Sequence, residues 1–525
     1  MNRRRLFVGC FISLIATAFG FAVRGAILDD WGQQFNLSQE DKGVIQGVGL
    51  FPFAISIILI SLVIDRIGYG TAMMIAFVGH VSSALLTIFS TNFQMLYVGT
   101  FIYALSNGVV EAVINPVVAT MYDRNKTHWL NVLHAGWPGG LVLGGLLAIG
   151  VQAGGDMLGT LPGRIWQWQM ALVLIPTLVY GVALFGQKFP VQERVAAGVS
   201  YKDMLREFGW GSAYICSVLL IGGVVQIVHV TFGVEAPSLL VQAAAALVPT
   251  VLFALYVRSF GRPMFVFLLL VMFLLATTEL GTDSWIADIM RAVLQDPHKG
   301  TLFLVYTSLI MFVLRFFAGP LVHRISPLGL LTLCAAIACG GLLWLANAGS
   351  ALSVLLMAAT FYAFGKTFFW PTTLGVVSEQ YPRGGALMMN AIAGVGMLAV
   401  GVIGSPAIGT IQDHRIDTLL SQEAPAIHTQ VMKETQGIFG ETRTVDPEKA
   451  AALSKPEQAQ LEELTITAKQ GALGRIAILP GIMFVCYLGL LAYFRSKGGY
   501  RSEVLTGHAA DDEKFTGGVA GPVEA

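Results

Sequence analysis

Long apolar segments recur along the whole chain and are separated by shorter polar stretches. Each has about 20 residues or more, the length that a helix needs to cross the hydrocarbon core of a bilayer. The pattern predicts an all-α integral membrane protein with six such helices, then a pair, then six more. The expected ranges of these 14 helices are 6–28, 43–64, 71–90, 95–118, 130–152, 168–188, 211–231, 239–257, 264–286, 301–321, 328–347, 351–377, 385–411 and 474–494.

The positions of these helices divide the chain into two halves around an insert. Residues 1–190 hold the first six helices and 263–500 hold the last six, whereas 191–262 form a linker and an additional transmembrane hairpin. Arg3 to Arg5 precede an apolar run that is too long for a signal peptide, so we expect an uncleaved first helix. The tail 501–525, with its Gly, Ala, Asp and Glu, is expected to be disordered.

One polar segment, 412–473, is much longer than the other loops of its side. It contains two helix starts, Asp446-Pro447-Glu448 and Ser454-Lys455-Pro456-Glu457, in which a capping residue is followed by proline and an acid. The segment is either a surface excursion that covers the outer mouth or a lid that captures a substrate or a partner, since long loops are often functional.

Positive charge is unevenly distributed between the loops. Lys and Arg gather in the loops on the side of the N-terminus, whereas the opposite loops 91–94, 232–238 and 348–350 carry none; Arg291 and Lys299 are exceptions. Loops rich in Lys and Arg stay in the cytoplasm. We therefore expect a protein of the plasma (inner) membrane with both termini cytoplasmic.

Composition supports the membrane class and excludes other functions. Of 525 residues, 55% are hydrophobic and 12% are charged, against roughly 25% charged in soluble proteins. Lys plus Arg and Asp plus Glu each number 32, so a nucleic-acid partner is not expected. All five cysteines lie in apolar segments, which indicates neither disulfides nor a zinc site, and we expect no metal and no cofactor. Neither HExxH nor G-x-S-x-G occurs, and we expect no enzyme.

Two ionisable residues of opposite sign occupy matching places in the two halves. Glu111 lies five residues before Pro116, and Lys366 lies five residues before Pro371. A charge within the hydrocarbon is costly and normally faces a bundle interior or a wet cavity. Internal repeats with polar groups near the middle of the membrane are typical of secondary transporters. The pattern therefore predicts transport of a small molecule.

A short charged loop also occurs once in each half. A tight loop with a charged pair can hold a neighbouring helix end in one conformation. These loops resemble the Gly-x-x-x-Asp-Arg-x-Gly signature of the major facilitator superfamily, although the first copy begins with Ser and the second has His in place of Asp. The residues of the two copies are Ser61, Asp65, Arg66 and Gly68, and Gly319, His323, Arg324 and Ser326.

A closer resemblance lies in the fourth and fifth helices. The run from Asn107 to Pro116, followed by Leu130-Asn131, His134 and Gly140, resembles the fucose:proton symporter family within that superfamily. The resemblance implies two six-helix bundles that rock about a central cavity, here with a two-helix insert, and sugar/proton symport in which the buried Glu111 takes part in coupling.

The chain departs from that family in two places. The family has an acid in its first helix, where this chain has Arg24, and the hairpin 211–257 resembles inserts in peptide and drug transporters instead. An ion pair with Arg24 would leave Glu111 a purely structural role. The site residues that we expect for proton coupling are Glu111, Arg24, Glu279 and Lys366.

Lys366 needs a carboxylate neighbour to stay charged. Glu279 is the first candidate partner by position and Asp283 the second, since both stand on the first helix of the second bundle. Amides suit sugar hydroxyl groups, an imidazole can relay protons, and aromatic rings can stack on a sugar, although all of these also serve helix packing. The candidates for substrate binding are Asn115, Asn131, His134, Trp137, Trp285, Phe369, Trp370 and Asp283.

Proton-coupled uptake of a sugar or related polyol is thus the leading expectation. An organic anion is the alternative substrate, because Arg24 and Lys366 could bind a carboxylate or phosphate. A membrane sensor that transports nothing is a further alternative.

Overall fold

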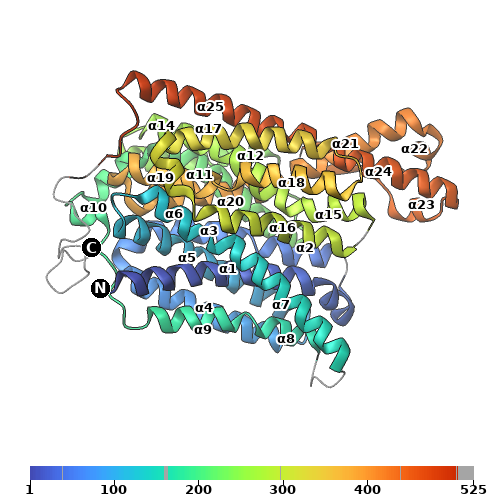
Figure 1. The fold of residues 1–525 in the computed structure, drawn as a ribbon, viewed down its shortest axis with the longest axis horizontal. Helices are drawn as coiled ribbons and strands as arrows, with labels where there is room; N and C mark the ends of the chain where they lie inside the picture. The colour runs from blue at the N-terminus through green and yellow to red at the C-terminus, as the bar shows by residue number, and fades with distance from the viewer. Residues whose placement is uncertain (38, 159–163, 296, 438, 504, 506–525) are drawn as a thin grey trace.

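The computed structural model describes residues 1–525 apart from 38, 159–163, 296, 438, 504 and 506–525. Most of the tail that we expect to be disordered therefore lies outside the described residues. The structure is a bundle of long helices lying side by side (Figure 1). Thirteen described helical stretches are long and apolar enough to cross a membrane, and Leu302–Arg315 forms a shorter apolar helix. This last helix falls in the predicted range 301–321, so the full count of 14 spans is not confirmed.

The first half forms six of these stretches, in the predicted places. The second of them is interrupted between α2 and α3 at Gly49, and α5 has Pro116 inside it. The helices are α1 (Arg3–Phe35), α2 (Gln39–Val48), α3 (Phe51–Ile67), α4 (Tyr69–Ile88), α5 (Phe93–Met121), α6 (Lys126–His134), α7 (Gly136–Leu158), α8 (Ile165–Ala171) and α9 (Leu174–Leu184).

The predicted accessory hairpin follows. Its first helix, α11, kinks at Gly209, whose φ of 68° suits glycine. Gly223 of α11 lies where both bundles meet, since a Cβ there would be 2.9 Å from Leu398 and 3.8 Å from Ile55. The helices of this part are α10 (Glu193–Ala196), α11 (Tyr201–Phe232), α12 (Leu239–Ala245) and α13 (Leu247–Val257).

The second half forms the other bundle. Two of its spans contain a π-helical turn, which widens the helix locally and often occurs at functional sites. The elements are α14 (Pro263–Ala276), the π-helix η1 (Thr277–Gly281), α15 (Thr282–Leu294), α16 (Pro297–Arg315), α17 (Ala318–Ala346), α18 (Leu352–Lys366), α19 (Phe369–Gln380), the 3-10 turn η2 (Pro382–Gly384), α20 (Gly385–Ala399), the π-helix η3 (Val400–Gly404), α21 (Ser405–Glu423), α24 (Lys455–Ile476) and α25 (Ile478–Ser496).

The segment 412–473 differs from the predicted loop. Helical structure continues for 42 residues over Pro382–Glu423 and for 42 residues over Lys455–Ser496. Much of the segment therefore consists of helical extensions of these two spans, which project beyond the bundle. Between them lie α22 (Pro425–Val431), an antiparallel hairpin of β1 (Met432–Gly437) and β2 (Gly440–Val445), and α23 (Pro447–Ala451).

We call these elements, with the adjoining ends of α21 and α24, the lobe. It has a small apolar core of its own, which includes Leu420, Val431 and Ala468. Both predicted helix starts are confirmed, because Asp446 caps α23 and Ser454 forms a capping box with Glu457 at α24. In Figure 1 the lobe projects from the end opposite to that at which α1 begins and α25 ends. We call these two ends the lobe end and the termini end.

The two charged loops lie at the termini end and differ in their contacts. In the first copy, Asp65 forms an ion pair with Arg194 of the linker, and the Arg66 guanidinium lies 5.7 Å from the centre of the Tyr201 ring. Gly68 has a φ of 77°, and in the second copy Ser326 takes the matching conformation with a φ of 64°. The second copy thus keeps the backbone shape of the first without its acid.

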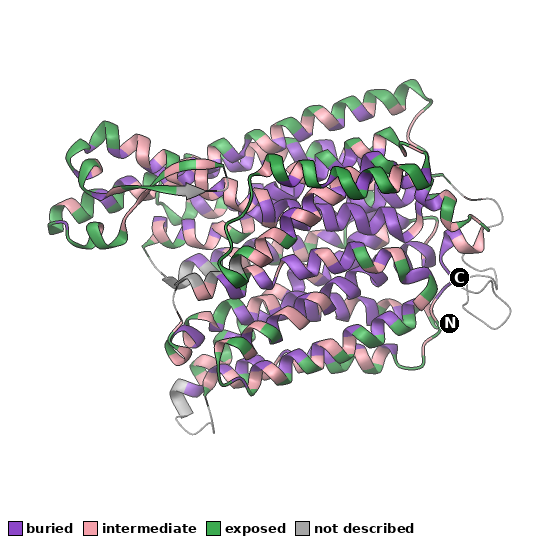
Figure 2. Ribbon diagram, turned by 180° about the vertical axis from the view of Figure 1, so that it is seen from behind, coloured by how far each residue is buried: buried purple, intermediate pink, exposed green. Residues whose placement is uncertain are grey.

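The bundles meet closely at the termini end. Thr127 Oγ1 of α6 donates to Glu379 Oε1 of α19 at 2.5 Å, and Asn131 Nδ2 donates to Thr372 Oγ1 at 3.1 Å. A Cβ at Gly375 would lie 2.3 Å from Thr127 Oγ1, so this glycine permits the contact. Figure 2 shows buried residues concentrated in the central helices and exposed ones on the outer helices and the lobe. The termini end is closed in this arrangement.

Candidate functional site

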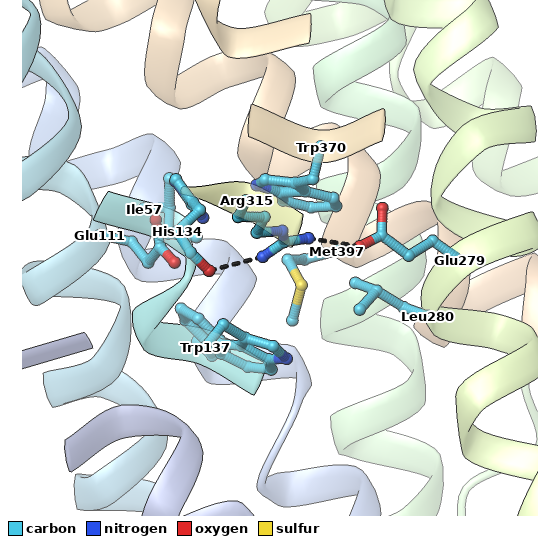
Figure 3. A pocket seen from close by; sticks show the side chains of 10 residues that line it. Ile57, Glu111, His134, Trp137, Glu279, Leu280, Arg315, Trp370 and Met397 are labelled. Atoms are coloured by element: carbon cyan, nitrogen blue, oxygen red, sulfur yellow. Dashed lines mark hydrogen bonds and ion pairs between the residues drawn. The ribbon is translucent and has the colours of Figure 1, made fainter. Parts of the chain in front are cut away.

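A cavity lies between the two bundles and has an empty volume of about 380 Å³. Its walls combine two carboxyl groups, an imidazole, a guanidinium and two indole rings with apolar side chains (Figure 3). The mixture of apolar walls with a few polar groups is typical of a small-molecule site. The lining residues are Phe53, Ile57, Glu111, His134 and Trp137 from the first bundle and Glu279, Leu280, Arg315, Trp370 and Met397 from the second.

Glu111 begins a chain of hydrogen bonds along the first-bundle wall. Asn115 Nδ2 donates to Glu111 Oε2 at 2.7 Å, and Asn115 Oδ1 lies 2.8 Å from Nε2 of His134. Asn115 stands one turn after Glu111 on α5, so the two side chains share a face of the helix. All three residues are buried, with exposed fractions of 4% or less. The structure thus brings together three of the predicted site residues, Glu111, Asn115 and His134.

Arg315 at the end of α16 links the bundles across the cavity. Its Nη2 donates to Glu279 Oε1 at 3.0 Å, its Nη1 donates to the His134 carbonyl oxygen at 2.5 Å, and its Nε donates to the Thr367 carbonyl oxygen at 2.8 Å. The ion pair is buried, because the side chains of Arg315 and Glu279 are 2% and 3% exposed. Glu279 lies on the π-helix η1, whose wider turn places it at the wall.

Lys366 pairs with the second of its two predicted partners. Its ammonium group contacts Asp283, while Glu279 is taken by Arg315. The prediction that Glu279 would be the first choice is therefore wrong. Asp283 lies four residues beyond Glu279, and a lysine side chain at the end of α18 reaches it instead.

Arg24 and Glu111 do not form the ion pair that their helix positions allow. Arg24 Nη2 donates to Ser83 Oγ at 2.9 Å, and its guanidinium lies 3.9 Å from the centre of the Tyr103 ring. Arg24 is inside the first bundle and is not among the residues that line the cavity. The physical reason is a polar pocket on α4 and α5, where the ring face and the hydroxyl group receive the cation.

The remaining predicted residues have different places. Trp370 lines the cavity, whereas Asn131 donates to Thr372 across the closed termini end. Trp285 Nε1 donates to Ser405 Oγ at 3.0 Å, toward the lobe end. Phe369 is fully buried and is not among the lining residues. Of the predicted aromatic platforms, the structure thus places Trp137 and Trp370 at the cavity.

The sequence reasoning missed Arg315, which supplies the central cation. Its signal was present, because an arginine inside the predicted span 301–321 is as unusual as Glu111 or Lys366. It also missed a buried network in the first bundle, in which His80 contacts both Tyr180 and Asn107. Among the described residues, no group of three or more His, Cys, Asp or Glu side chains is placed to hold a metal ion.

Comparison with known proteins identifies the family. Residues 10–406 match the model of the Major Facilitator Superfamily. The chain belongs to this superfamily. The protein is thus a multi-pass membrane transporter with the fold that its two charged loops suggest. No curated protein sequence matches the chain.

Solved structures of other members share the fold at low sequence identity. The E. coli Fucose:proton symporter is 14% identical, with a TM-score of 0.55 over 92% of this chain and 98% of that one. A proton-dependent oligopeptide transporter is 14% identical, with a TM-score of 0.60 over 94% and 100%. The human organic anion transporter MFSD10 is 13% identical, with a TM-score of 0.56 over 93% and 100%. These likenesses concern the fold.

Proposed function

We propose that this major facilitator protein carries out proton-coupled symport of a sugar or related polyol by alternating access. The observation that carries the proposal is the difference between the two carboxyl groups of the cavity. Glu279 is ion-paired with Arg315, whereas Glu111 has an amide, Asn115, as its hydrogen-bond partner. A carboxyl group without a cation can take up and release a proton as its surroundings change between wet and dry. Glu111 is accordingly the proton carrier of the proposal.

The cations near the cavity support a neutral substrate. Arg315 donates to Glu279 and to two backbone carbonyl oxygens, and Lys366 is paired with Asp283. Arg24 lies inside the first bundle, against Tyr103. A carboxylate substrate would have to displace one of these partners, at the cost of leaving a buried charge unpaired.

The cavity surface suits a sugar. Trp137 comes from the first bundle and Trp370 from the second, and both line the cavity, with Arg315 and Met397 drawn between them in Figure 3. Indole faces pack against the apolar face of a sugar ring, and the amide and imidazole groups near Glu111 can hydrogen-bond hydroxyl groups. The likeness of the fold to a Fucose:proton symporter points in the same direction.

The position of the cavity between two bundles that meet at the termini end supports the proposed alternating access. Opening that end requires the contacts of Thr127 with Glu379 and of Asn131 with Thr372 to separate. We propose that both termini are cytoplasmic in a plasma (inner) membrane, so that the structure represents the state closed to the cytoplasm. A rocking motion of one bundle against the other would expose the same cavity to the cytoplasm.

The proposal is tested by uptake of labelled sugars into liposomes that contain the purified protein. With an acidic exterior and a neutral interior, a substrate sugar is expected to accumulate above its external concentration. An ionophore that dissipates the pH gradient should lower the sugar concentration inside the liposomes to that outside. Accumulation that is the same with and without the gradient would contradict proton coupling.

An organic anion is the second candidate, and one observation favours it: the Arg315 side chain lines the cavity. A thermal-stability screen separates the two classes, because a ligand that binds the folded state raises the melting temperature. Sugars and polyols are expected to stabilise the protein, and carboxylates and sugar acids are not. Stabilisation by carboxylates alone would replace the first proposal by the second.

A further inference from the structure

A second, larger cavity opens at the termini end. Its empty volume is about 1920 Å³, and it shares no lining residue with the central cavity. One wall is the turn between α5 and α6 of the first bundle, and the others are α17 and the end of α25 in the second. The cavity lies beside the contact that closes this end, since Thr127 and Glu379, which form that contact, also line the cavity.

The charged side chains of this cavity are mainly basic. Arg124 lines it from the first bundle, and Arg324 and Arg495 line it from the second. All three are exposed, and among the described residues none of them has an ion-pair partner. Two imidazoles, those of His128 and His323, lie on the same walls.

The acid that lines the cavity is already engaged. Glu379 accepts hydrogen bonds from the Thr127 hydroxyl and backbone N–H at 2.5 and 3.2 Å, and from the Tyr500 hydroxyl at 2.8 Å. Its carboxylate therefore belongs to the contact between the bundles and does not pair with the arginines. In the part of the chain that the structure describes, the lining of the cavity thus carries excess positive charge.

The internal repeat shows how the two charged loops differ. In the first charged loop, Asp65 pairs with Arg194, so the linker helix α10 packs against this loop. In the second loop, His323 stands where Asp65 stands in the first, and Arg324 has no acid beside it in the loop. The repeated structure therefore keeps a charged loop but leaves an open basic cavity in the second half.

One wall of the cavity is apolar and belongs to a helix on the outside of the bundle. Leu488 and Phe494 of α25 line it, and Leu488 is 44% exposed. In a membrane protein, such exposed apolar side chains contact lipid. The cavity thus has basic side chains near the ends of the spans and, beside them, an apolar surface suited to acyl chains.

We infer that this cavity binds a phosphate group, carried either by the headgroup of an anionic lipid or by a soluble phosphate compound. Guanidinium groups match phosphate oxygens in geometry and bind them with paired hydrogen bonds. Because Arg124 belongs to one bundle and Arg324 and Arg495 belong to the other, the bound phosphate would connect the bundles. It would thereby favour the state that is closed at the termini end.

The test uses the full chain, purified and stripped of lipid, with three probes: phosphatidylglycerol, phosphatidylcholine and inorganic phosphate. Binding is followed by native mass spectrometry and by the shift in melting temperature. The variant is the double substitution Arg324→Gln and Arg495→Gln. The matched control is Arg4→Gln with Arg258→Gln, which removes the same charge from exposed arginines of the termini end outside the cavity.

We expect phosphatidylglycerol to bind at least about tenfold more weakly to the double variant, as expected from the loss of charged hydrogen bonds, and the control to differ from the parent by less than about twofold. Competition by inorganic phosphate would identify a site for soluble phosphates as well, and binding of the lipid alone would identify a lipid site. The inference would be overturned if the variant and the control weakened phosphatidylglycerol binding equally. It would also be overturned if the protein showed no preference for phosphatidylglycerol over phosphatidylcholine and did not bind inorganic phosphate.

Discussion

Arg315 lies between two carboxyl groups that belong to different bundles, although it is ion-paired with only one of them (Figure 3). Its bond to the His134 carbonyl oxygen ties the second bundle to the wall that carries Glu111. Glu111 and Arg315 line the same cavity, so protonation of Glu111 changes the charge of a wall that Arg315 contacts through His134. A proton at Glu111 and the relative position of the bundles are therefore expected to influence each other.

Mutation can test which ion pairs of the second bundle contribute to its stability. Removing one partner of a buried pair leaves an unpaired charge and typically costs about 3–5 kcal/mol. We expect Arg315→Gln and Glu279→Gln each to lower the thermal stability strongly and the double variant to be less impaired than their sum. The measurement is a double-mutant cycle of melting temperatures in detergent.

The pair Lys366 and Glu279 serves as the comparison for that cycle. These residues are neighbours of the network without a direct contact, since Lys366 is bonded to Asp283. The interaction energy between Lys366 and Glu279 in a double-mutant cycle should be clearly smaller than that between Arg315 and Glu279. A larger coupling for Lys366 with Glu279 would show that the pairing in the structure is not the one that matters for stability.

At this scale, the sequence predicts which residues are unusual but not which of them meet. An acid or base inside an apolar helix is visible in the sequence, as Glu111 and Lys366 are. The choice between Glu279 and Asp283 as partner depends on the rotation of one helix against another and on the π-helical turn at η1. Neither has a signal in a single sequence, and the same holds for the stacking of Arg24 on Tyr103.

At the scale of elements, glycines decide how closely helices of different bundles approach. Gly375 of α19 lies against Thr127 of α6, and Gly394 of α20 lies against Ile58 of α3. Without a Cβ, each allows the neighbouring backbone or side chain to come near. The contact at Gly375 is part of the closed termini end and must separate when that end opens.

Gly375→Ala should therefore weaken the closed state, because its Cβ would lie 2.3 Å from Thr127 Oγ1. Gly150→Ala is the matched control, since nothing lies within 4 Å of a Cβ there. The readout is labelling of a cysteine at Ala119, a buried position near this contact, in a background without native cysteines. We expect faster labelling with Gly375→Ala only. Unchanged labelling in both variants would show that the glycine contact does not hold the end closed.

The extent of the elements was predictable where hydrophobic length and caps define it. The transmembrane stretches and the helix starts at Asp446 and Ser454 follow the sequence. The lobe was not predictable as a folded unit, because polar residues such as those of α21 and α24 give no sign that the spans continue as helices. Its stability comes from contacts between segments far apart in the sequence, for example Leu420 with the core around Ala468.

At the scale of the whole molecule, the start of α1 and the end of α25 lie at the opposite end of the bundle from the lobe (Figure 1). Cysteines at Ser421 in α21 and at Ser502 after α25, both exposed, are therefore expected to react with an impermeant thiol reagent from opposite sides of the membrane. Right-side-out and inside-out vesicles provide the two sides. Reaction of both from one side would contradict the arrangement and the assignment of the termini to the cytoplasm.

The central claim is that Glu111 carries the proton that drives transport. Gln at this position keeps the shape and the hydrogen bond to Asn115 but removes the titrating group. The measurement compares, in liposomes, the exchange of labelled sugar at equal concentrations with uphill uptake under a pH gradient. Glu462→Gln, an exposed acid of α24, is the control. The account predicts that Glu111→Gln retains exchange and loses uphill uptake, while the control keeps both. Uphill uptake at the parent level by Glu111→Gln would contradict the account and assign coupling to another group.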